Sequence, residues 1–353
     1  MSGMNTEIVK MDAANIDETV IEKAADIIKN GGLVAFPTET VYGLGANALD
    51  ADASKKIYEA KGRPSDNPLI AHIASLDTLD EIVEDVSDVA KKLIDKFWPG
   101  PMTLIFNKKP NVPDSTTGGL DTLAVRFPSN EIAMELIKKS GVPIAAPSAN
   151  TSGKPSPTKG EHVIEDLDGK VDMIIDGGEV GLGLESTIID VTGEPTILRP
   201  GFITQEMLEQ VIEEVKLDQT ILEKPTEDFA PKAPGMKYRH YAPKADLIIV
   251  RGEANKVADW IIKEAAKSDK KTAILTVNQH IDFYEGKAND SIVASWGDLN
   301  DMEDIAHKVF NWLRKIDEMG IDIVYCEAFE EEGLGLAVMN RLTKAAGYQV
   351  IDV

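Results

Sequence analysis

Cysteine, histidine and long apolar runs are scarce in this chain of 353 residues. Its one cysteine, Cys326, excludes an internal disulfide framework and fits a reducing compartment, so we expect a buried thiol in a cytoplasmic protein. The five histidines show no metal-ligand spacing, so no metal-binding residues are predicted. No apolar run is long enough to cross a bilayer, and the amino terminus lacks the features of a secretory signal. We therefore expect no membrane association.

Two common catalytic motifs are also missing. The sequence contains neither the phosphate-binding pattern GxxxxGK[ST] nor the GxSxG nucleophile elbow. One GxGxxA match runs from Gly43 to Ala48, but it starts seven residues after the preceding predicted strand. The acidic residue about twenty positions later, Asp66, lies in a proline-rich loop instead of at a strand end. The pattern does not favour a dinucleotide site.

Positive charge is in deficit, with 37 Lys and Arg against 60 Asp and Glu, a net charge of −23. Such a surface should repel a polyanion, so we expect no direct tight binding of nucleic acid. The basic residues of the motif-bearing segments are Lys61, Arg63, Arg126, Lys154, Lys159, Arg199, Lys237 and Arg239. This concentration favours a small anion held in a pocket over a long nucleic acid.

The chain is long enough for two domains. Densely grouped strands with unequal helices predict an α/β or α+β domain with a mixed sheet over residues 12–215. A proline-rich segment, 216–245, reads as a linker. Regular alternation of strand and helix over 246–353 predicts a small parallel α/β domain. We further predict a helix at 159–166, with Thr158 and Glu161 as its capping box.

Six polar segments follow apolar strands in the first domain. They are residues 37–45 (PTETVYGLG), 61–72 (KGRPSDNPLIAH), 121–126 (DTLAVR), 146–157 (APSANTSGKPSP), 185–187 (EST) and 198–201 (LRPG). Hydroxyl, amide and guanidinium groups recur at the carboxyl ends of strands, which is where ligands collect in sheet proteins. Each segment alone could be a cap, a turn or a surface ion pair, but six together predict one site.

These six segments, in this order, resemble the YrdC-type threonylcarbamoyl-adenylate synthases. The segment PGMKYRHYAP and the C-terminal GLGLAVMNRLTKAAG are similar to the long two-domain form of that family. The resemblance implies a twisted, concave mixed sheet with a basic pocket, followed by a Rossmann-like domain. It also implies that ATP, L-threonine and bicarbonate give threonylcarbamoyl-AMP and pyrophosphate. The product would pass to a tRNA threonylcarbamoyl transferase, which modifies tRNA next to the anticodon.

The resemblance also implies residue roles. Thr40, His72, Arg126, Ala146 and Ser186 match positions expected around L-threonine. Arg63, Asn67, Thr122, Ser148, Ser156 and Arg199 match positions expected to hold ATP, and Lys61 matches a lysine expected at the phosphates. Lys61 and Arg63 are therefore our catalytic candidates.

The residue chemistry fits these roles. A carbamate attacks a triphosphate poorly because both are anions, so the site must neutralise charge and fix geometry. Lys61 and Arg63 are suited to phosphate, and Arg126 to the threonine carboxylate or the carbamate. Asn150, near Ser148, adds an amide for phosphate or ribose. No general base stands out, although His72 is a candidate for proton handling. Magnesium is expected with ATP, but its ligands are not evident.

Other interpretations stay open at this level. One is a module that binds double-stranded RNA on a concave basic sheet. Another is carbamoyl transfer from carbamoyl phosphate, although such proteins carry cysteine clusters that this chain lacks. The linker ends in an aromatic and basic cluster, which predicts a lid over the first domain's pocket. His240 and Tyr241 would then meet the nucleotide, with Lys237 or Arg239 near its phosphates.

Overall fold

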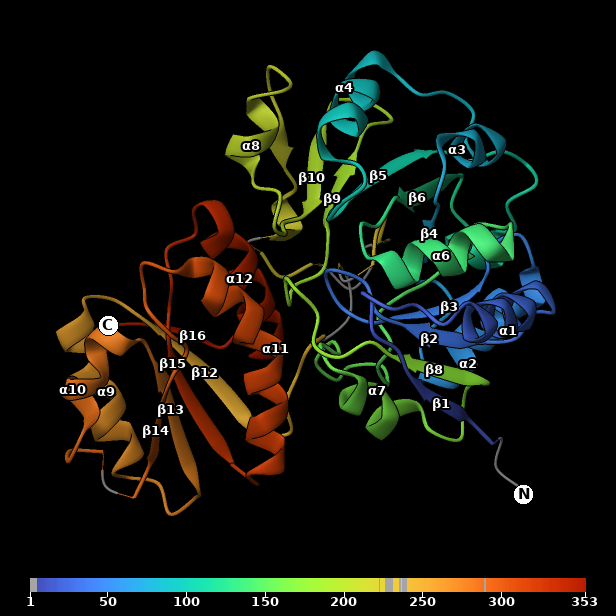
Figure 1. Ribbon diagram of the computed structural model, residues 1–353. Coiled ribbons are helices and arrows are strands. Elements are labelled where there is room, and N and C mark those ends of the chain that lie inside the picture. The colour runs from blue at the N-terminus through green and yellow to red at the C-terminus, as the bar shows by residue number, and fades with distance from the viewer. Residues whose placement is uncertain (1–4, 222, 226–230, 235, 237–239, 289) are drawn as a thin grey trace. The chain divides into compact units, whose positions relative to one another are not determined.

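A computed structural model describes residues 5–221, 223–225, 231–234, 236, 240–288 and 290–353 (Figure 1). The chain divides into two compact units. The N-terminal unit comprises residues 1–152 and 156–237, and the C-terminal unit comprises 153–155 and 238–353. The division after residue 237 falls inside the predicted linker. Within the described ranges, no helix has the length and apolar character needed to cross a bilayer.

The N-terminal unit is built on an 11-stranded mixed sheet with the order β1-β8-β2-β3-β7-β4-β6-β5-β9-β10-β11. The strands are β1 Glu7–Lys10, β2 Val34–Phe36, β3 Gly43–Asn47, β4 Ile70–His72, β5 Met102–Asn107, β6 Thr122–Arg126, β7 Ile144–Ala145, β8 Met173–Asp176, β9 Thr187–Asp190, β10 Thr196–Arg199 and β11 Lys216–Leu217. The helices are α1 Glu18–Lys29, α2 Ala51–Lys61, α3 Leu76–Ile82, α4 Asp88–Phe97, α5 Asp114–Thr117, α6 Glu131–Ser140, α7 Gly160–Leu167 and α8 Gln205–Glu209, with a 3₁₀ turn at Gln219–Ile221.

Helices α1 and α6 lie side by side on one face of this sheet (Figure 1). Each has an apolar stripe at helical spacing, which predicts burial of that stripe against the sheet. The buried residues of α1 are Ile21, Ala24, Ala25 and Ile28, and those of α6 are Ile132, Ala133, Leu136 and Ile137. They pack on Val34 and Phe36 of β2, Ile144 of β7 and Met173 and Ile175 of β8. The helices therefore cover the half of the sheet that contains β8, β2 and β7.

On the other half, part of the predicted linker packs directly on the sheet. Ala233 and Met236 are buried against Ile70, Ala124 and Ile105 of β4, β6 and β5. They also contact Ile188 of β9 and Leu198 of β10. Residues two apart on a strand face the same way, so this is the face that His72 and Arg126 also occupy. The linker segment thus belongs to the core of the N-terminal unit.

The C-terminal unit has a five-stranded sheet with the order β14-β13-β15-β12-β16. All its strand pairs are parallel, as the alternating pattern predicts. Its strands are β12 Asp246–Arg251, β13 Thr272–Thr276, β14 Ile292–Ser295, β15 Ile323–Glu327 and β16 Val350–Asp352. Its helices are α9 Ala254–Ala265, α10 Ile281–Tyr284, α11 Met302–Glu318 and α12 Gly333–Ala345, with a 3₁₀ turn at Asn278–His280. Residues of α9 and α10 share one core with the sheet, and α11 packs against α12. Cys326 is buried in β15, as predicted.

One local prediction differs from the structure. The predicted capping box before α7 is wrong, because the cap position is Lys159 and no side chain caps it. Thr158 instead donates its backbone N–H to Nδ1 of His162 at 3.2 Å. The GxGxxA segment forms β3, which pairs antiparallel with β2. A Cβ on Gly45 would lie 2.7 Å from both Ile144 and Phe36, so this glycine serves close packing.

Candidate active site

Two of the six polar segments, 37–45 and 146–157, are joined by backbone hydrogen bonds, and the first also contacts a residue just before the 185–187 segment. Leu44 donates to the carbonyl of Pro147 at 2.8 Å, and Ala149 donates to that of Tyr42 at 2.8 Å. Gly183 donates to the carbonyl of Thr40 at 3.1 Å. The loop after β2 therefore touches both the segment after β7 and the segment before β9. This brings the predicted residues Thr40, Ala146, Ser148 and Ser186 into one region.

A second set of predicted residues forms a row across the sheet. His72 at the end of β4 pairs in register with Arg126 of β6, which pairs with Thr103 of β5. The Thr103 hydroxyl shares a 2.7 Å hydrogen bond with that of Ser186. Residues in register on neighbouring strands point to the same face. The row therefore lines one continuous strip of the sheet face.

Arg126 is the centre of this strip and is 4% exposed. Its Nη1 donates to Oγ1 of Thr40 at 2.8 Å, and its Nε donates to the carbonyl of Gly100 at 3.3 Å. Its Nη2 lies 2.6 Å from Oε1 of Glu39. Thr40 in turn shares a 2.9 Å hydrogen bond with Thr38. A buried guanidinium held among hydroxyl groups is suited to bind a carboxylate.

His72 is buried beside Arg126, and its ring meets Phe36 edge-on at 6.4 Å. Burial, helped by the Arg126 charge, lowers the pKa of His72 to about 3. Its Nδ1 lies 3.1 Å from the carbonyl of Ile70, which fits a neutral ring that donates from Nδ1. A neutral imidazole of such low basicity is better suited to accept a hydrogen bond than to remove a proton at neutral pH.

Arg199, at the end of β10, contacts the strip at Ser186. Its Nε and Nη2 donate to the carbonyl of Ser186 at 3.1 and 3.0 Å, and Nη2 is 3.2 Å from its hydroxyl. The following turn needs glycine at Gly201. A Cβ there would lie 2.5 Å from the backbone nitrogen of Thr187 and 2.7 Å from the carbonyl of Glu185. The LRPG and EST segments are thus packed together backbone to backbone.

Lys61, Ser148 and Asn150 form a polar cluster next to this strip. The Lys61 ammonium, 2% exposed, donates to the carbonyls of Ser148 and Asn150 at 2.5 Å each. The Ser148 hydroxyl donates to Oδ1 of Asn150 at 2.5 Å. Nearby in the sequence, the hydroxyl of Ser156 donates to Oε1 of Glu185 at 2.6 Å. An amide and two hydroxyl groups thus lie along the loop after β7, and the Lys61 cation at the end of α2 bonds to that loop.

The last predicted residues lie at the opposite ends of β4 and β6. Nη2 of Arg63 donates to the carbonyls of Asn67 and Pro68 at 3.3 and 3.2 Å. Oδ1 of Asn67 is buried and has no hydrogen-bond partner among the described residues. Continuing the pairing of Ile70 with Ala124 would put Thr122 opposite Pro68. Thr122 and Arg126 are four positions apart on β6, about 13 Å in an extended strand.

The linker residues of the predicted site are only partly described. Lys237 and Arg239 lie outside the described residues. His240 and Tyr241 belong to the C-terminal unit, where the Tyr241 ring lies tilted against that of Phe310 of α11, with ring centres 5.0 Å apart. The guanidinium of Arg341 lies 5.9 Å from the Tyr241 ring centre. The end of the linker is therefore anchored in the C-terminal unit.

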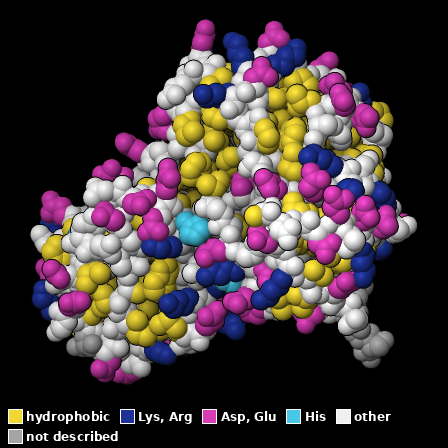
Figure 2. Space-filling model, in the orientation of Figure 1, with side chains coloured by type: hydrophobic (Ala, Val, Ile, Leu, Met, Phe, Trp, Pro, Cys, Tyr) yellow, Lys and Arg dark blue, Asp and Glu magenta, His cyan; other side chains and the backbone are white. Residues whose placement is uncertain are grey.

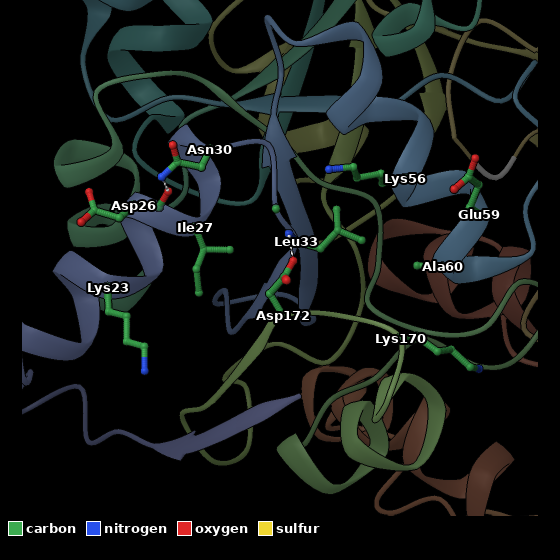
Figure 3. Close-up of a pocket in the computed structure, with 11 residues that line it drawn as sticks. Lys23, Asp26, Ile27, Asn30, Leu33, Lys56, Glu59, Ala60, Lys170 and Asp172 are labelled. Carbon is green, nitrogen blue, oxygen red and sulfur yellow. Dashed lines mark hydrogen bonds between the residues drawn. The ribbon is translucent and has the colours of Figure 1, made fainter. Parts of the chain in front are cut away.

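A separate pocket of about 770 Å³ lies at the end of α1 (Figure 3). It is lined by Lys23, Asp26, Ile27, Asn30, Gly32, Leu33, Lys56, Glu59, Ala60, Lys170 and Asp172, none of which is a predicted site residue. Two of its polar side chains already form hydrogen bonds within the protein. Lys56 donates to the carbonyl of Gly31, and Asp172 accepts from the backbone N–H of Leu33. The pocket therefore does not mark the site formed by the six segments.

Sequence reasoning missed three side chains that the structure places in the region. Thr103 lies in the apolar strand β5, and its single hydroxyl group was the only sequence feature that could have indicated a site residue there. Glu39 and Glu185 lie within recognised segments, yet a carboxylate there resembles an ordinary surface acid. Only their burial and their contacts with Arg126 and Ser156 show that they belong to the site. Among the described residues, no group of three or more His, Cys, Asp or Glu could hold a metal ion.

Two family models match the chain. Sua5_yciO_yrdC, described as Telomere recombination, matches residues 26–201. Sua5_C, described as Threonylcarbamoyl-AMP synthase, C-terminal domain, matches residues 203–347. The threonylcarbamoyl-AMP synthase of Pyrococcus abyssi is 50% identical over 342 residues, which cover 96% of this chain and 97% of the relative. The chain belongs to the threonylcarbamoyl-AMP synthase family. The Bacillus subtilis synthase is 45% identical over 342 residues, or 96% of each chain.

Solved structures confirm the predicted fold class. P. abyssi Sua5 in complex with L-threonine matches with a TM-score of 0.90 and 48% identity, covering 99% of this chain and 100% of that chain. E. coli YciO matches with a TM-score of 0.50 and 27% identity, covering 56% of this chain and 96% of its own. This member of the family is therefore an enzyme with the two-domain architecture expected from its sequence.

Proposed function

We propose that this chain joins L-threonine, bicarbonate and ATP into threonylcarbamoyl-AMP. The threonine amine attacks the carbon of bicarbonate, and water leaves as the carbamate forms. A carbamate oxygen then attacks the α-phosphorus of ATP, and pyrophosphate leaves. The product would supply a tRNA threonylcarbamoyl transferase that modifies tRNA next to the anticodon. Membership of the family supports this reaction, and a cytoplasmic location remains our prediction.

The observation that carries the proposal is the buried strip around Arg126. A guanidinium with two hydroxyl neighbours, Thr40 and the more distant Ser186, matches the carboxylate and hydroxyl of threonine. The neutral ring of His72 and the methyl group of Ala146 border the same strip. The threonine complex of the P. abyssi relative supports placing threonine here.

ATP would lie beyond the strip, along the loops that hold Lys61, Arg63 and Asn67. Lys61 and Arg63 would neutralise the phosphates while their present carbonyl contacts keep the two loops in shape. Thr122, Ser148, Asn150, Ser156 and Arg199 would contribute hydroxyl, amide and guanidinium contacts to the nucleotide. The unpartnered Oδ1 of Asn67 would accept a hydrogen bond from it.

Magnesium would accompany the triphosphate. It is usually held by one or two carboxylates together with phosphate oxygens and water. The buried carboxylate of Glu185, next to Ser156, fits such a limited contribution. Bound magnesium would offset charge on the phosphates.

Mass spectrometry tests this function directly. Purified full-length protein is incubated with ATP, L-threonine and ¹³C-bicarbonate, and the products are separated. We expect a threonylcarbamoyl-AMP ion that carries one ¹³C atom, together with pyrophosphate. An adenylate without the label, or AMP alone, would contradict the proposed order of bond formation.

We also propose that the linker serves as a lid. The product is a mixed anhydride that water destroys, so exclusion of water would preserve it. The burial of Ala233 and Met236 on the sheet face that also carries Arg126 supports this role. The contact of Tyr241 with Phe310 gives the linker a second fixed point, within the C-terminal unit. His240 and Tyr241 would then meet the nucleotide when the lid is closed.

A further inference from the structure

The Glu39–Arg126 pair in the threonine strip has an unusual local structure. Oε1 of Glu39 is 2.6 Å from Nη2 of Arg126, and the side chains are 14% and 5% exposed. Both carboxylate oxygens and Nη2 nevertheless lack a hydrogen bond of good geometry among the described residues. Buried charged groups normally have their hydrogen bonds satisfied. The pair therefore has unused donor and acceptor capacity.

Glu39 stays ionised in this position. Burial by itself raises the pKa of its carboxyl group. The Arg126 charge and the nearby backbone N–H groups of Glu39 and Ser129 outweigh burial and hold that pKa below its usual value. An ionised carboxylate offers about four lone-pair sites, so beside these contacts it can still accept from a further cationic donor.

An α-amino acid carries the complementary pair of charges on one carbon atom. Its carboxylate can accept a hydrogen bond from Nη2 of Arg126, and its ammonium can donate one to the carboxylate of Glu39. Thr40 would lie next to both, because it accepts from Arg126 and follows Glu39 in the chain. His72, being neutral, adds no competing charge.

We propose that Glu39 binds the α-ammonium group of L-threonine and so selects amino acids over carboxylic acids that lack an amine. The proposal rests on the assignment of threonine to this strip. It gives Glu39 a direct contact with substrate and fixes the position of the nitrogen atom that later attacks bicarbonate. The same carboxylate offsets the charge of Arg126, which explains how a buried guanidinium is tolerated there.

Calorimetric binding to full-length protein can test this assignment. The ligands are L-threonine and 3-hydroxybutanoate, which is threonine without its amino group. Glu39→Gln keeps the shape of the side chain and removes its charge. We expect it to weaken threonine binding by about tenfold to a hundredfold, the range for one charge-assisted hydrogen bond. Binding of 3-hydroxybutanoate should change less than about threefold.

Glu135→Gln is the matched control. Glu135 is a partly exposed residue of α6, paired with Lys138, and its neutralisation should leave both affinities unchanged. If Glu39→Gln does not fold, Glu39→Asp replaces it. Its shorter carboxylate should reduce the preference for threonine and leave 3-hydroxybutanoate unaffected.

Two outcomes would overturn this inference and leave the assignment of threonine to the strip intact. Equal weakening of both ligands would mean that Glu39 acts only by supporting Arg126. An undiminished preference for threonine would mean that another group binds the ammonium. If the wild-type protein binds no threonine, the assignment of threonine to the strip falls as well, and the inference falls with it.

Discussion

Single side chains carry the positive charge of the site, and Arg63 offers the plainest test. We expect Arg63→Ala to reduce kcat/KM for ATP by roughly tenfold to a hundredfold, because it removes a charge-assisted donor worth about 1.5–3 kcal/mol. Steady-state kinetics and thermal unfolding give the two readouts. Arg251→Ala, which removes an exposed arginine paired with Glu331, is the control. Normal activity per folded molecule would show that Arg63 has only a structural role.

Amino-acid choice is a second property of individual residues. Serine lacks one methyl group of threonine, a difference worth only about 1–3 kcal/mol in a pocket. We therefore expect serine to be used tens to a few hundred times less efficiently than threonine. Valine should be worse still, because the hydroxyl groups of Thr40 and Ser186 would lose a partner. Equal pyrophosphate release with valine and threonine would contradict a site that reads the hydroxyl.

His72 predicts a pH dependence of stability. Its pKa is about 3 in the folded protein and near 6.5 in the unfolded chain, so the unfolded state binds more protons between these values. Its contribution to the free energy of unfolding is therefore present above about pH 6.5 and is lost as pH falls. The loss approaches about 1.4 kcal/mol per pH unit.

Urea unfolding of wild-type protein and His72→Gln at pH 7 and pH 4.5 isolates this contribution. The wild-type protein should lose more stability than the variant on acidification. Parallel loss in both proteins would show that His72 does not titrate as described.

At the scale of elements, sequence patterns located most helices and strands but missed specific local contacts. Helix α6 and strand β8 are examples of the first kind, because amphipathic periodicity indicates the helix and a short apolar run indicates the buried strand. Strand β3 was not predicted, since GLGAN has low strand propensity and its glycines are required by neighbouring strands. Thr158 failed as a cap because tertiary contacts of the preceding loop determine where α7 begins.

The sequence predicted the site residues that lie in motifs, but not the contacts between them. Motif residues such as Arg126 and Ser186 could be assigned from the resemblance. Their common strip, however, is created by strand register, which brings Thr103 between them. Glu39 was not assigned because its ion pair joins residues far apart in the sequence. Composition and spacing contain no signal for such a contact.

The proposed lid role of the linker can be tested by substituting one buried residue. Met236→Ser should loosen the segment that packs on β4, β6 and β9, because it removes a buried apolar side chain. If the linker is a lid, the ratio of free AMP to intact threonylcarbamoyl-AMP should rise. Met102→Ser, a buried methionine of β5 outside this cluster, controls for general destabilisation. An unchanged product ratio in folded Met236→Ser would rule against the lid.

For the whole molecule, net charge predicts weak binding to nucleic acid. The chain carries −23, and acidic side chains are spread across the visible face in Figure 2. We expect no retention of tRNA or double-stranded RNA at micromolar protein in filter binding at two salt concentrations. Tight binding that weakens steeply with salt would instead support an RNA-binding module.

The central claim is that the enzyme activates a carbamate formed from threonine and bicarbonate. Pyrophosphate release by full-length protein, with each substrate omitted in turn, measures this most directly. We predict release only when ATP, L-threonine and bicarbonate are all present, and background release when any one is missing. Sustained release without threonine would mean that ATP is cleaved independently of carbamate formation, and it would contradict the account.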